Sequence, residues 1–257
     1  MPETILLERV GGVARVTLNR PDVLNSFNPE MFSRMLAVLD EVGADRSVRA
    51  VLITGSGRGF SAGQDLAGGI SEGSYGDHLE HSWNKVVRRL RAMEKPVVAA
   101  VNGVAAGAGA NLALNCDFVI AAEEASFIQA FINIGLVPDT GGSWILPHLV
   151  GTAHAAAMLM LGEKVPAQRA YELGMVYKVV PLAGLEGEAM GLATRLAAMP
   201  TMAIALTKQL IQAAATNTLA EQLVAEAEMQ TIAGKSADHG EGVAAFREKR
   251  KAVFKGE

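Results

Sequence analysis

The spacing of apolar residues changes several times along the first third of the chain, and each spacing predicts an element. Residues 4–21, TILLERVGGVARVTLNRP, predict two strands joined by a Gly-Gly turn. Residues 28–45 predict a helix, because Asn28 can cap it, Pro29 suits its first position and apolar residues follow at helical spacing. Residues 48–57, VRAVLITGSG, are a short apolar run closed by glycine, which is typical of a buried parallel strand.

The middle of the chain continues this alternation. Residues 58–76 are rich in Gly and Ser and predict a loop. Residues 77–94 have the spacing of an amphipathic helix, and residues 95–103 predict another buried strand. Residues 107–122 predict a helix of small residues that leads into a further strand. Strands that alternate with helices indicate an α/β fold.

The last third of the chain is helical by pattern. Residues 140–180 predict more helix with one short strand, and residues 184–257 predict helices broken at Pro200 and near Gly234. The composition leaves open whether these final helices form a lid over the protein or a contact between subunits.

Composition and charge narrow the class of protein. The chain has 257 residues, half of them apolar, which suits one compact domain or one domain with an appendage. Its net charge of −4 provides no basic field, so we expect neither nucleic acid nor a membrane as a partner. We identify no signal peptide and no run of about 18 apolar residues that predicts a membrane span, and we expect a soluble cytoplasmic protein. The single cysteine, Cys116, excludes an internal disulfide and indicates a buried thiol.

The common cofactor motifs do not fit. Gly57, Gly59 and Ala62 approximate a dinucleotide fingerprint, but neither a helix nor an acidic residue about 20 positions later follows them. His78 and His81 would need a third ligand to hold a metal, so we expect surface histidines there. We therefore expect no metal and no separate cofactor.

Three stretches of the sequence are candidates for an active site. The segment GRGFSAGQDL can turn sharply after a strand and expose backbone N–H groups, and NGVAAGAGANLAL can open a helix whose first N–H groups lack partners. Two such groups would form an oxyanion hole, although small residues also serve close helix packing. In GLVPDTGGSW, Asp139 is either a helix N-cap or an acid that transfers protons.

Together these motifs, with LNRPDVLNSFNPEM upstream, resemble the crotonase (enoyl-CoA hydratase/isomerase) superfamily over nearly the whole chain. The resemblance implies a spiral of ββα units in residues 1–195, which would hold the CoA-thioester site. It also implies that residues 196–257 form a helical region for oligomerisation and active-site closure. The expected assembly is a homotrimer or a dimer of trimers.

The resemblance also assigns roles to individual residues. The backbone amides of Gln64 and Ala108 would hold the thioester oxygen, and the CoA arm is expected near Arg20, Val23, Ala62, Asp65 and Leu66. The two glutamates that hydratases use correspond to Asn111 and Phe131 here, and neither can take a proton from water. Asp139 remains as the acid, in apolar surroundings (Phe131, Ile134, Leu136 and Val137) that should raise its pKa. This pattern implies an isomerase that acts on acyl-CoA thioesters, with CoA as part of the substrate.

Within the superfamily, the motifs resemble most the members that act on aromatic-ring epoxides in bacterial phenylacetate degradation. That likeness implies conversion of ring-1,2-epoxyphenylacetyl-CoA to oxepin-CoA. A Δ3,Δ2-enoyl-CoA isomerase of fatty acid oxidation would use the same residues and differ only in the shape of its pocket. We expect the loop over residues 67–82, with Tyr75, His78 and Trp83, to shape the acyl pocket. The same motifs are also compatible with a non-catalytic acyl-CoA binding protein and with a residual hydratase that acts through Asp139.

Overall fold

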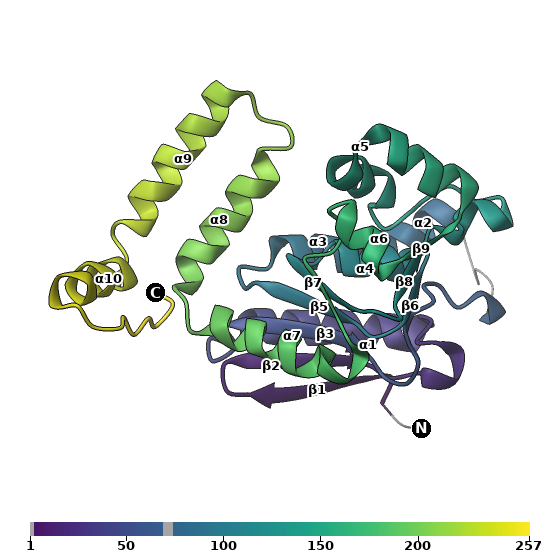
Figure 1. Ribbon diagram of the computed structural model, residues 1–257, viewed down its shortest axis with the longest axis horizontal. Helices are drawn as coiled ribbons and strands as arrows, with labels where there is room; N and C mark the ends of the chain where they lie inside the picture. The colour runs from purple at the N-terminus through teal and green to yellow at the C-terminus, as the bar shows by residue number, and fades with distance from the viewer. Residues whose placement is uncertain (1–2, 69–73) are drawn as a thin grey trace.

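Two β-sheets form the centre of the computed structural model, which describes residues 3–68 and 74–257 (Figure 1). The larger sheet has the order β1-β2-β3-β5-β7-β10, and its neighbouring strands are parallel except β1 with β2. Its strands are β1 (Ile5–Val10), β2 (Val13–Leu18), β3 (Ala50–Gly55), β5 (Val97–Val101), β7 (Phe118–Ala122) and β10 (Lys178–Val180). The smaller sheet has the order β4-β6-β8-β9, with β9 antiparallel to β8. Its strands are β4 (Gly59–Ser61), β6 (Val104–Ala106), β8 (Ser126–Ile128) and β9 (Lys164–Pro166).

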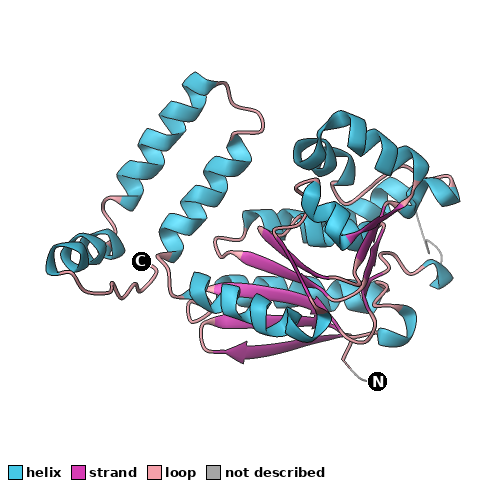
Figure 2. Ribbon diagram, in the orientation of Figure 1, coloured by secondary structure: helices cyan, strands magenta, loops and turns pink. Residues whose placement is uncertain are grey.

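Helices cover these sheets, and a separate group of helices projects to one side (Figure 2). The helices of the body are α1 (Pro29–Ala44), α2 (Tyr75–His81), α3 (Trp83–Ala92), α4 (Ala108–Leu114), α5 (Gly142–Leu161), α6 (Ala167–Glu172) and α7 (Leu182–Ala197). The projecting helices are α8 (Thr201–Ala213), α9 (Leu219–Ala233) and α10 (Ala237–Glu248). Short 3₁₀ turns are η1 (Pro21–Val23), η2 (Leu66–Gly68) and η3 (Ala130–Ile134).

The chain repeats one pattern three times, in which a strand of the larger sheet is followed by a strand of the smaller sheet and then by helix. The pairs are β3 with β4, β5 with β6, and β7 with β8. Each repeat therefore advances both sheets by one strand, which winds the chain into a spiral. The α/β fold and the spiral of ββα units are confirmed.

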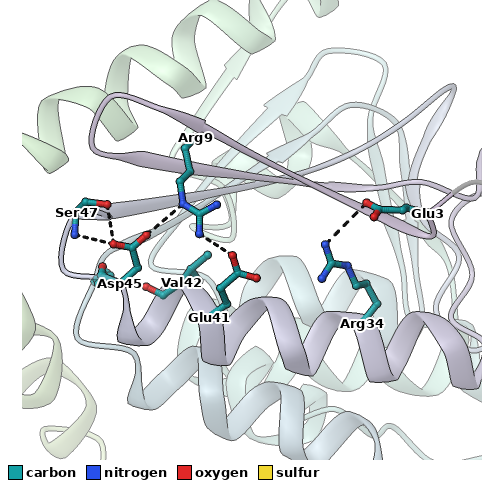
Figure 3. A network of polar contacts seen from close by, with 8 residues as sticks. Glu3, Arg9, Arg34, Glu41, Val42, Asp45 and Ser47 are labelled. Atoms are coloured by element: carbon teal, nitrogen blue, oxygen red, sulfur yellow. Dashed lines mark hydrogen bonds and ion pairs between the residues drawn. The ribbon is translucent and has the colours of Figure 1, made fainter.

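The N-terminal elements form as the local sequence predicts. Asn28 caps α1 by accepting a hydrogen bond from the backbone N–H of Met31 at 2.9 Å, and Pro29 occupies the first turn. Arg9 of β1 joins this helix through Glu41 and Asp45 (Figure 3). These ion pairs are exposed, so the buried apolar face of α1 provides most of the attachment.

The structure differs from three of the predicted elements. The loop predicted over residues 58–76 begins with a strand, β4, and residues 69–73 of it lie outside the described residues. The helix predicted over residues 77–94 is broken at Ser82, whose φ of −122° and ψ of −97° are not helical. Residues 140–180 contain two short strands, β9 and β10, where one was predicted.

From the sequence we expected no apolar segment long enough to span a membrane, and helix α5 is an exception by length and composition. It is the one described helix long and apolar enough, by length and composition, to cross a membrane. Gly151 has φ 72° and ψ 164°, which interrupts the helix, and Pro147 lies inside it. The helix also packs against α4 and η3. A single helix with these properties is weak evidence for a membrane span, because core helices of globular proteins share them.

The projecting helices are attached to the body by polar bonds. Lys208 of α8 is buried and donates to the carbonyl oxygen of Leu90 and to the carboxylate of Asp117, both at 2.9 Å. Helix α7, just before this group, packs across β3, β5 and β7. Helix α9 contacts α8 but has no buried residue, and its apolar side chains Leu219, Leu223 and Val224 are exposed.

Candidate active site

Two segments that are 45 residues apart in the sequence meet at the start of α4. Gly63, after β4, has a φ of +85°, and a methyl group on it would lie 3.0 Å from the backbone nitrogen of Ala108. A methyl group on Gly109 would overlap the carbonyl oxygen of Ser61. Glycines at both positions let the two backbones approach directly, which places Gln64 beside Ala108.

The backbone N–H groups of Gln64 and Ala108 have no acceptor among the described residues. Ala108 opens α4, and the first N–H groups of a helix have no partner within it. Gln64 forms a parallel bridge with Phe27, in which Phe27 donates to Gly63 (2.7 Å) and accepts from Asp65 (3.0 Å). This pairing uses the groups on either side of Gln64 and leaves its own N–H available.

Asp139 lies just before α5 and does not cap it. The N-cap is Gly141, and the side chain of Asp139 accepts instead from the hydroxyl of Thr140 at 2.6 Å. The backbone carbonyl of Asp139 accepts from Gly142 N–H at 2.9 Å. The N-cap hypothesis is therefore wrong, because the backbone rather than the carboxylate serves the helix start.

A buried amide network ties Asp139 to α4. Asn111 donates its side-chain N–H to the backbone carbonyl of Asp139 at 2.8 Å and accepts from Gln129 at 2.8 Å. Gly142 packs so closely on the Asn111 amide that a methyl group there would collide with it. The helix that presents Ala108 thus also anchors the acidic residue.

Burial raises the pKa of Asp139, while the Thr140 hydrogen bond and the charge of His78 act in the opposite direction. The raised pKa of Asp139 agrees with the sequence prediction, but the side chains that bury the carboxylate differ in part from those expected. Ile134 and Val137 are exposed, so these two side chains do not enclose the carboxylate as expected. Phe131 is buried, and its ring lies 3.7 Å from the place of a methyl group on Gly107.

This geometry is accompanied by similarity over the full chain. Residues 8–257 match the sequence profile described as enoyl-CoA hydratase/isomerase. The chain belongs to that family. It is 47% identical to the 1,2-epoxyphenylacetyl-CoA isomerase of Escherichia coli (strain K12), with 100% of both chains covered.

Two further relatives carry hydratase names. A "Probable enoyl-CoA hydratase" from Rhodobacter capsulatus is 43% identical, with 98% of both chains covered. The crystal structure of an enoyl-CoA hydratase from Polaromonas sp. JS666 has a TM-score of 0.91 and 36% identity, and covers 97% of this chain and 99% of its own. Membership of this family places the chain among enzymes that act on acyl-CoA thioesters.

The residues expected near the CoA arm of a family substrate share one part of the surface: Arg20, Val23, Ala62, Asp65 and Leu66. Arg20 donates to the carboxylate of Asp65 at 2.8 Å and to the carbonyl of Ser26, and the Arg20 hydrogen bond lowers the pKa of Asp65. Val23 and Leu66 are exposed. The ion pair thus fastens η1 to the segment that carries Gln64 and leaves two apolar side chains at the surface.

The structure gives two residues beside the site roles that differ from those expected. Trp83 was expected to shape an acyl pocket, but it is fully buried and packs against Phe27 and Phe32. His78 was expected to be a surface histidine near the acyl pocket, but it is partly buried and contacts the side chain of Gln64. The aromatic residues at 27, 32 and 83 were a signal for this cluster, although only the fold brings them together.

Other features lie apart from this site. Cys116 is buried, and burial raises the pKa of its thiol, so it behaves as a core residue. A cavity of about 720 Å³ lies between α3, α5 and α8 and includes none of Gln64, Ala108 and Asp139 in its lining. In the part of the chain that the structure describes, no cluster of three or more His, Cys, Asp or Glu side chains could hold a metal.

Proposed function

We propose that this protein is an isomerase of acyl-CoA thioesters that converts ring-1,2-epoxyphenylacetyl-CoA to oxepin-CoA. The observation that carries the proposal is that one helix, α4, begins at an available backbone amide, Ala108, and is bonded through Asn111 to Asp139, a partly buried carboxylate with a raised pKa. The 47% identity to an enzyme named for this substrate supports the choice of acyl group. CoA enters as part of the substrate, and the proposed chemistry uses no separate cofactor.

In the proposed mechanism, the Asp139 carboxylate takes a proton from the carbon next to the thioester. The electrons move into the thioester carbonyl, and the amides of Gln64 and Ala108 stabilise the resulting oxyanion. The same carboxyl group then returns the proton to a distant carbon of the conjugated system. With the ring epoxide, the carbon–carbon bond of the epoxide opens to the seven-membered ring, and no atom is gained or lost.

The residues at the two hydratase positions favour isomerisation over hydration. The Asn111 amide has no acid–base group and is bonded to Gln129 and Asp139, and the buried Phe131 offers no polar group. Neither residue can activate a water molecule. Relatives named as hydratases nevertheless make hydration the competing activity. Conversion of a 2-enoyl-CoA in oxygen-18 water to a 3-hydroxyacyl-CoA that carries the label in its hydroxyl group would reveal it.

The decisive experiment compares the purified wild type with Asp139→Asn. Ring-1,2-epoxyphenylacetyl-CoA is generated in situ by its epoxidase, and a cis-3-enoyl-CoA is tested separately in deuterated water. We expect oxepin-CoA from the wild type and a loss of about 10²- to 10⁴-fold in Asp139→Asn, the range for general acid–base catalysis. Glu94→Gln, an exposed and distant acid, is the matched control.

Each competing function predicts a different result. Turnover of the 3-enoyl substrate alone would make the protein a Δ3,Δ2-enoyl-CoA isomerase of fatty acid oxidation. Tight binding of acyl-CoA without turnover of either substrate would make it a non-catalytic binding protein. Equal rates in the wild type and Asp139→Asn would remove Asp139 from the chemistry.

We also propose that the chain assembles as a homotrimer, or as a dimer of trimers, through residues 196–257. The exposed apolar side chains of α9 support this assembly, because a helix without a buried face is stabilised by a partner. Residues 1–195 would then carry the thioester site.

A further inference from the structure

The side chain of Gln64 is held by two ring N–H groups. Its carbonyl oxygen accepts from Nε1 of Trp83 at 3.2 Å and lies 3.1 Å from Nε2 of His78. Trp83 begins α3 and is fully buried, and His78 lies on α2. One oxygen thus joins the segment after β4 to two helices.

The chemistry of the three groups fixes their orientation. An indole N–H can only donate, so the oxygen of the Gln64 amide, and not its NH₂ group, must face Trp83. That oxygen can only accept, so Nε2 of His78 must carry a proton and donate to it. Of the two neutral tautomers, only the one that carries its proton on Nε2 makes this contact.

Trp83 and His78 are themselves packed in an aromatic cluster. The Trp83 ring packs against Phe27 and Phe32, with centroids 4.6 and 4.9 Å away. Phe32 also meets the ring of His78 edge-on at 6.1 Å. Because Phe27 pairs with the backbone on both sides of Gln64, the same aromatic cluster holds the main chain and the side chain of this residue.

We propose that the hydrogen-bond chain Trp83–Gln64–His78 positions the backbone N–H of Gln64 for the thioester oxygen, which makes Trp83 and His78 positioning residues of the reaction. The inference rests on the proposed role of the Gln64 and Ala108 amides. Gln64 then has two roles. Its backbone N–H donates to the substrate, and its side chain prevents rotation of that donor. Oxyanion donors act through fixed geometry, so a small rotation weakens them.

The first test removes the acceptor or a donor while keeping the shape. Gln64→Met replaces the amide by a group of similar length, Trp83→Phe keeps an aromatic ring without N–H, and His78→Leu removes the imidazole. His78→Gln restores an N–H donor and should recover function. We expect kcat to fall about tenfold in the first three variants, less than the 10²- to 10³-fold loss of a whole oxyanion donor, with KM changed little.

A spectroscopic readout separates positioning from general stability. The carbonyl stretch of bound [1-¹³C]phenylacetyl-CoA should shift to lower frequency in the wild type, because the oxyanion donors polarise that bond. We expect Gln64→Met and Trp83→Phe to lose much of the shift, and their double variant to lose no more than the stronger single one. Trp144→Phe and His81→Leu, at the other tryptophan and at an exposed histidine of α2, should retain it.

The outcomes distinguish this inference from the proposed function. Asp139→Asn should keep the carbonyl shift and lose turnover, which tests the acid alone. A full carbonyl shift in Gln64→Met, with kcat unchanged, would overturn the positioning role and leave the isomerase proposal intact. No shift in the wild type would overturn both the oxyanion assignment and the positioning role. Lower thermal stability with an unchanged shift would make the cluster a packing element only.

Discussion

Asn111 donates its side-chain N–H to the backbone carbonyl of Asp139, 28 residues later in the chain, at 2.8 Å. The same helix begins at Ala108, one turn earlier. The proposed oxyanion donor and the proposed acid are therefore attached to one short helix. Because Gln129 donates to the oxygen of the same amide, Asn111 cannot flip its amide without losing both bonds.

Gly142→Ala tests this attachment. The added methyl group would collide with the amide of Asn111, so that side chain must move and release the carbonyl of Asp139. We expect turnover to fall at least tenfold and the free energy of unfolding to fall by about 1–3 kcal/mol, since buried polar groups lose partners. Chemical denaturation and steady-state kinetics measure the two effects.

Gly184→Ala is the matched control for that substitution. Gly184 also lies in a helix, α7, but nothing lies within 4 Å of the place of its methyl group. We expect a gain of about 0.5–1 kcal/mol from the better helix propensity of alanine, with unchanged turnover. Equal kinetics in the two variants would show that the Asn111 contact does not support the site.

Asp139 should make both activity and stability depend on pH. Its pKa is raised by burial, so the folded protein holds this proton more tightly than the unfolded chain does. The resulting stabilisation is present at low pH and is lost as the pH rises through the folded pKa. Asp139→Asn cannot ionise, so we expect it to be more stable than the wild type at pH 7, with a gap that narrows on acidification.

Thermal unfolding of the two proteins between pH 7 and pH 5 checks this expectation. The kcat/KM of the wild type should rise with pH through the same raised pKa, because the base must be ionised. A wild type that is more stable than Asp139→Asn at pH 7 would contradict the burial argument.

Gly63→Ala tests the close approach of the two backbones. Gly63 has a positive φ, and its added methyl group would press on the N-terminus of α4. We expect a loss of about 1–3 kcal/mol in stability together with weaker thioester binding, measured by calorimetry with phenylacetyl-CoA. Gly11→Ala has a similar φ of +58° in open space, so it should lose stability and keep binding. Equal binding in both variants would disprove a specific role for the close approach.

Two substitutions in α9 test the proposed assembly. Leu223→Glu and Val224→Glu place charges on exposed apolar positions, where a partner subunit would bury them. We expect the double variant to show a smaller mass by light scattering than the wild type, with the body still folded by circular dichroism. Gln230→Glu adds charge to an exposed polar position of the same helix as a control. A wild type that is already monomeric would refute the trimer.

Local chemistry explains which elements could be predicted from the sequence. The hairpin of β1 and β2 and the cap of α1 at Asn28 depend on neighbouring residues, and both were predicted. The break between α8 and α9 was missed, although Thr218 and Glu221 form a capping box there. Strand β4 was also missed, because three residues become a strand only through β6, which lies more than 40 residues later.

The candidate site also has one part that could be predicted from the sequence and one part that could not. Motifs identified Gln64, Ala108 and Asp139, because the resemblance to a family supplied their roles. The anchoring amides of Asn111 and Gln129 and the contacts of His78 with Gln64 could not be predicted, since they depend on the packing of separate elements. Whether Asp139 caps a helix was likewise settled only by the observed bonds.

The close contacts of Gly63 and Gly109 have a consequence for how this site is encoded. Every amino acid except proline carries a backbone N–H, so neither donor is itself supplied by a side chain, although the proposed contacts of the Gln64 side chain orient its own N–H. The close approach of the two segments depends instead on two residues that have no functional group, since a methyl group on either would force the segments apart. A search for reactive side chains would pass over these residues, yet a saturation scan should find them among the least replaceable positions of the chain.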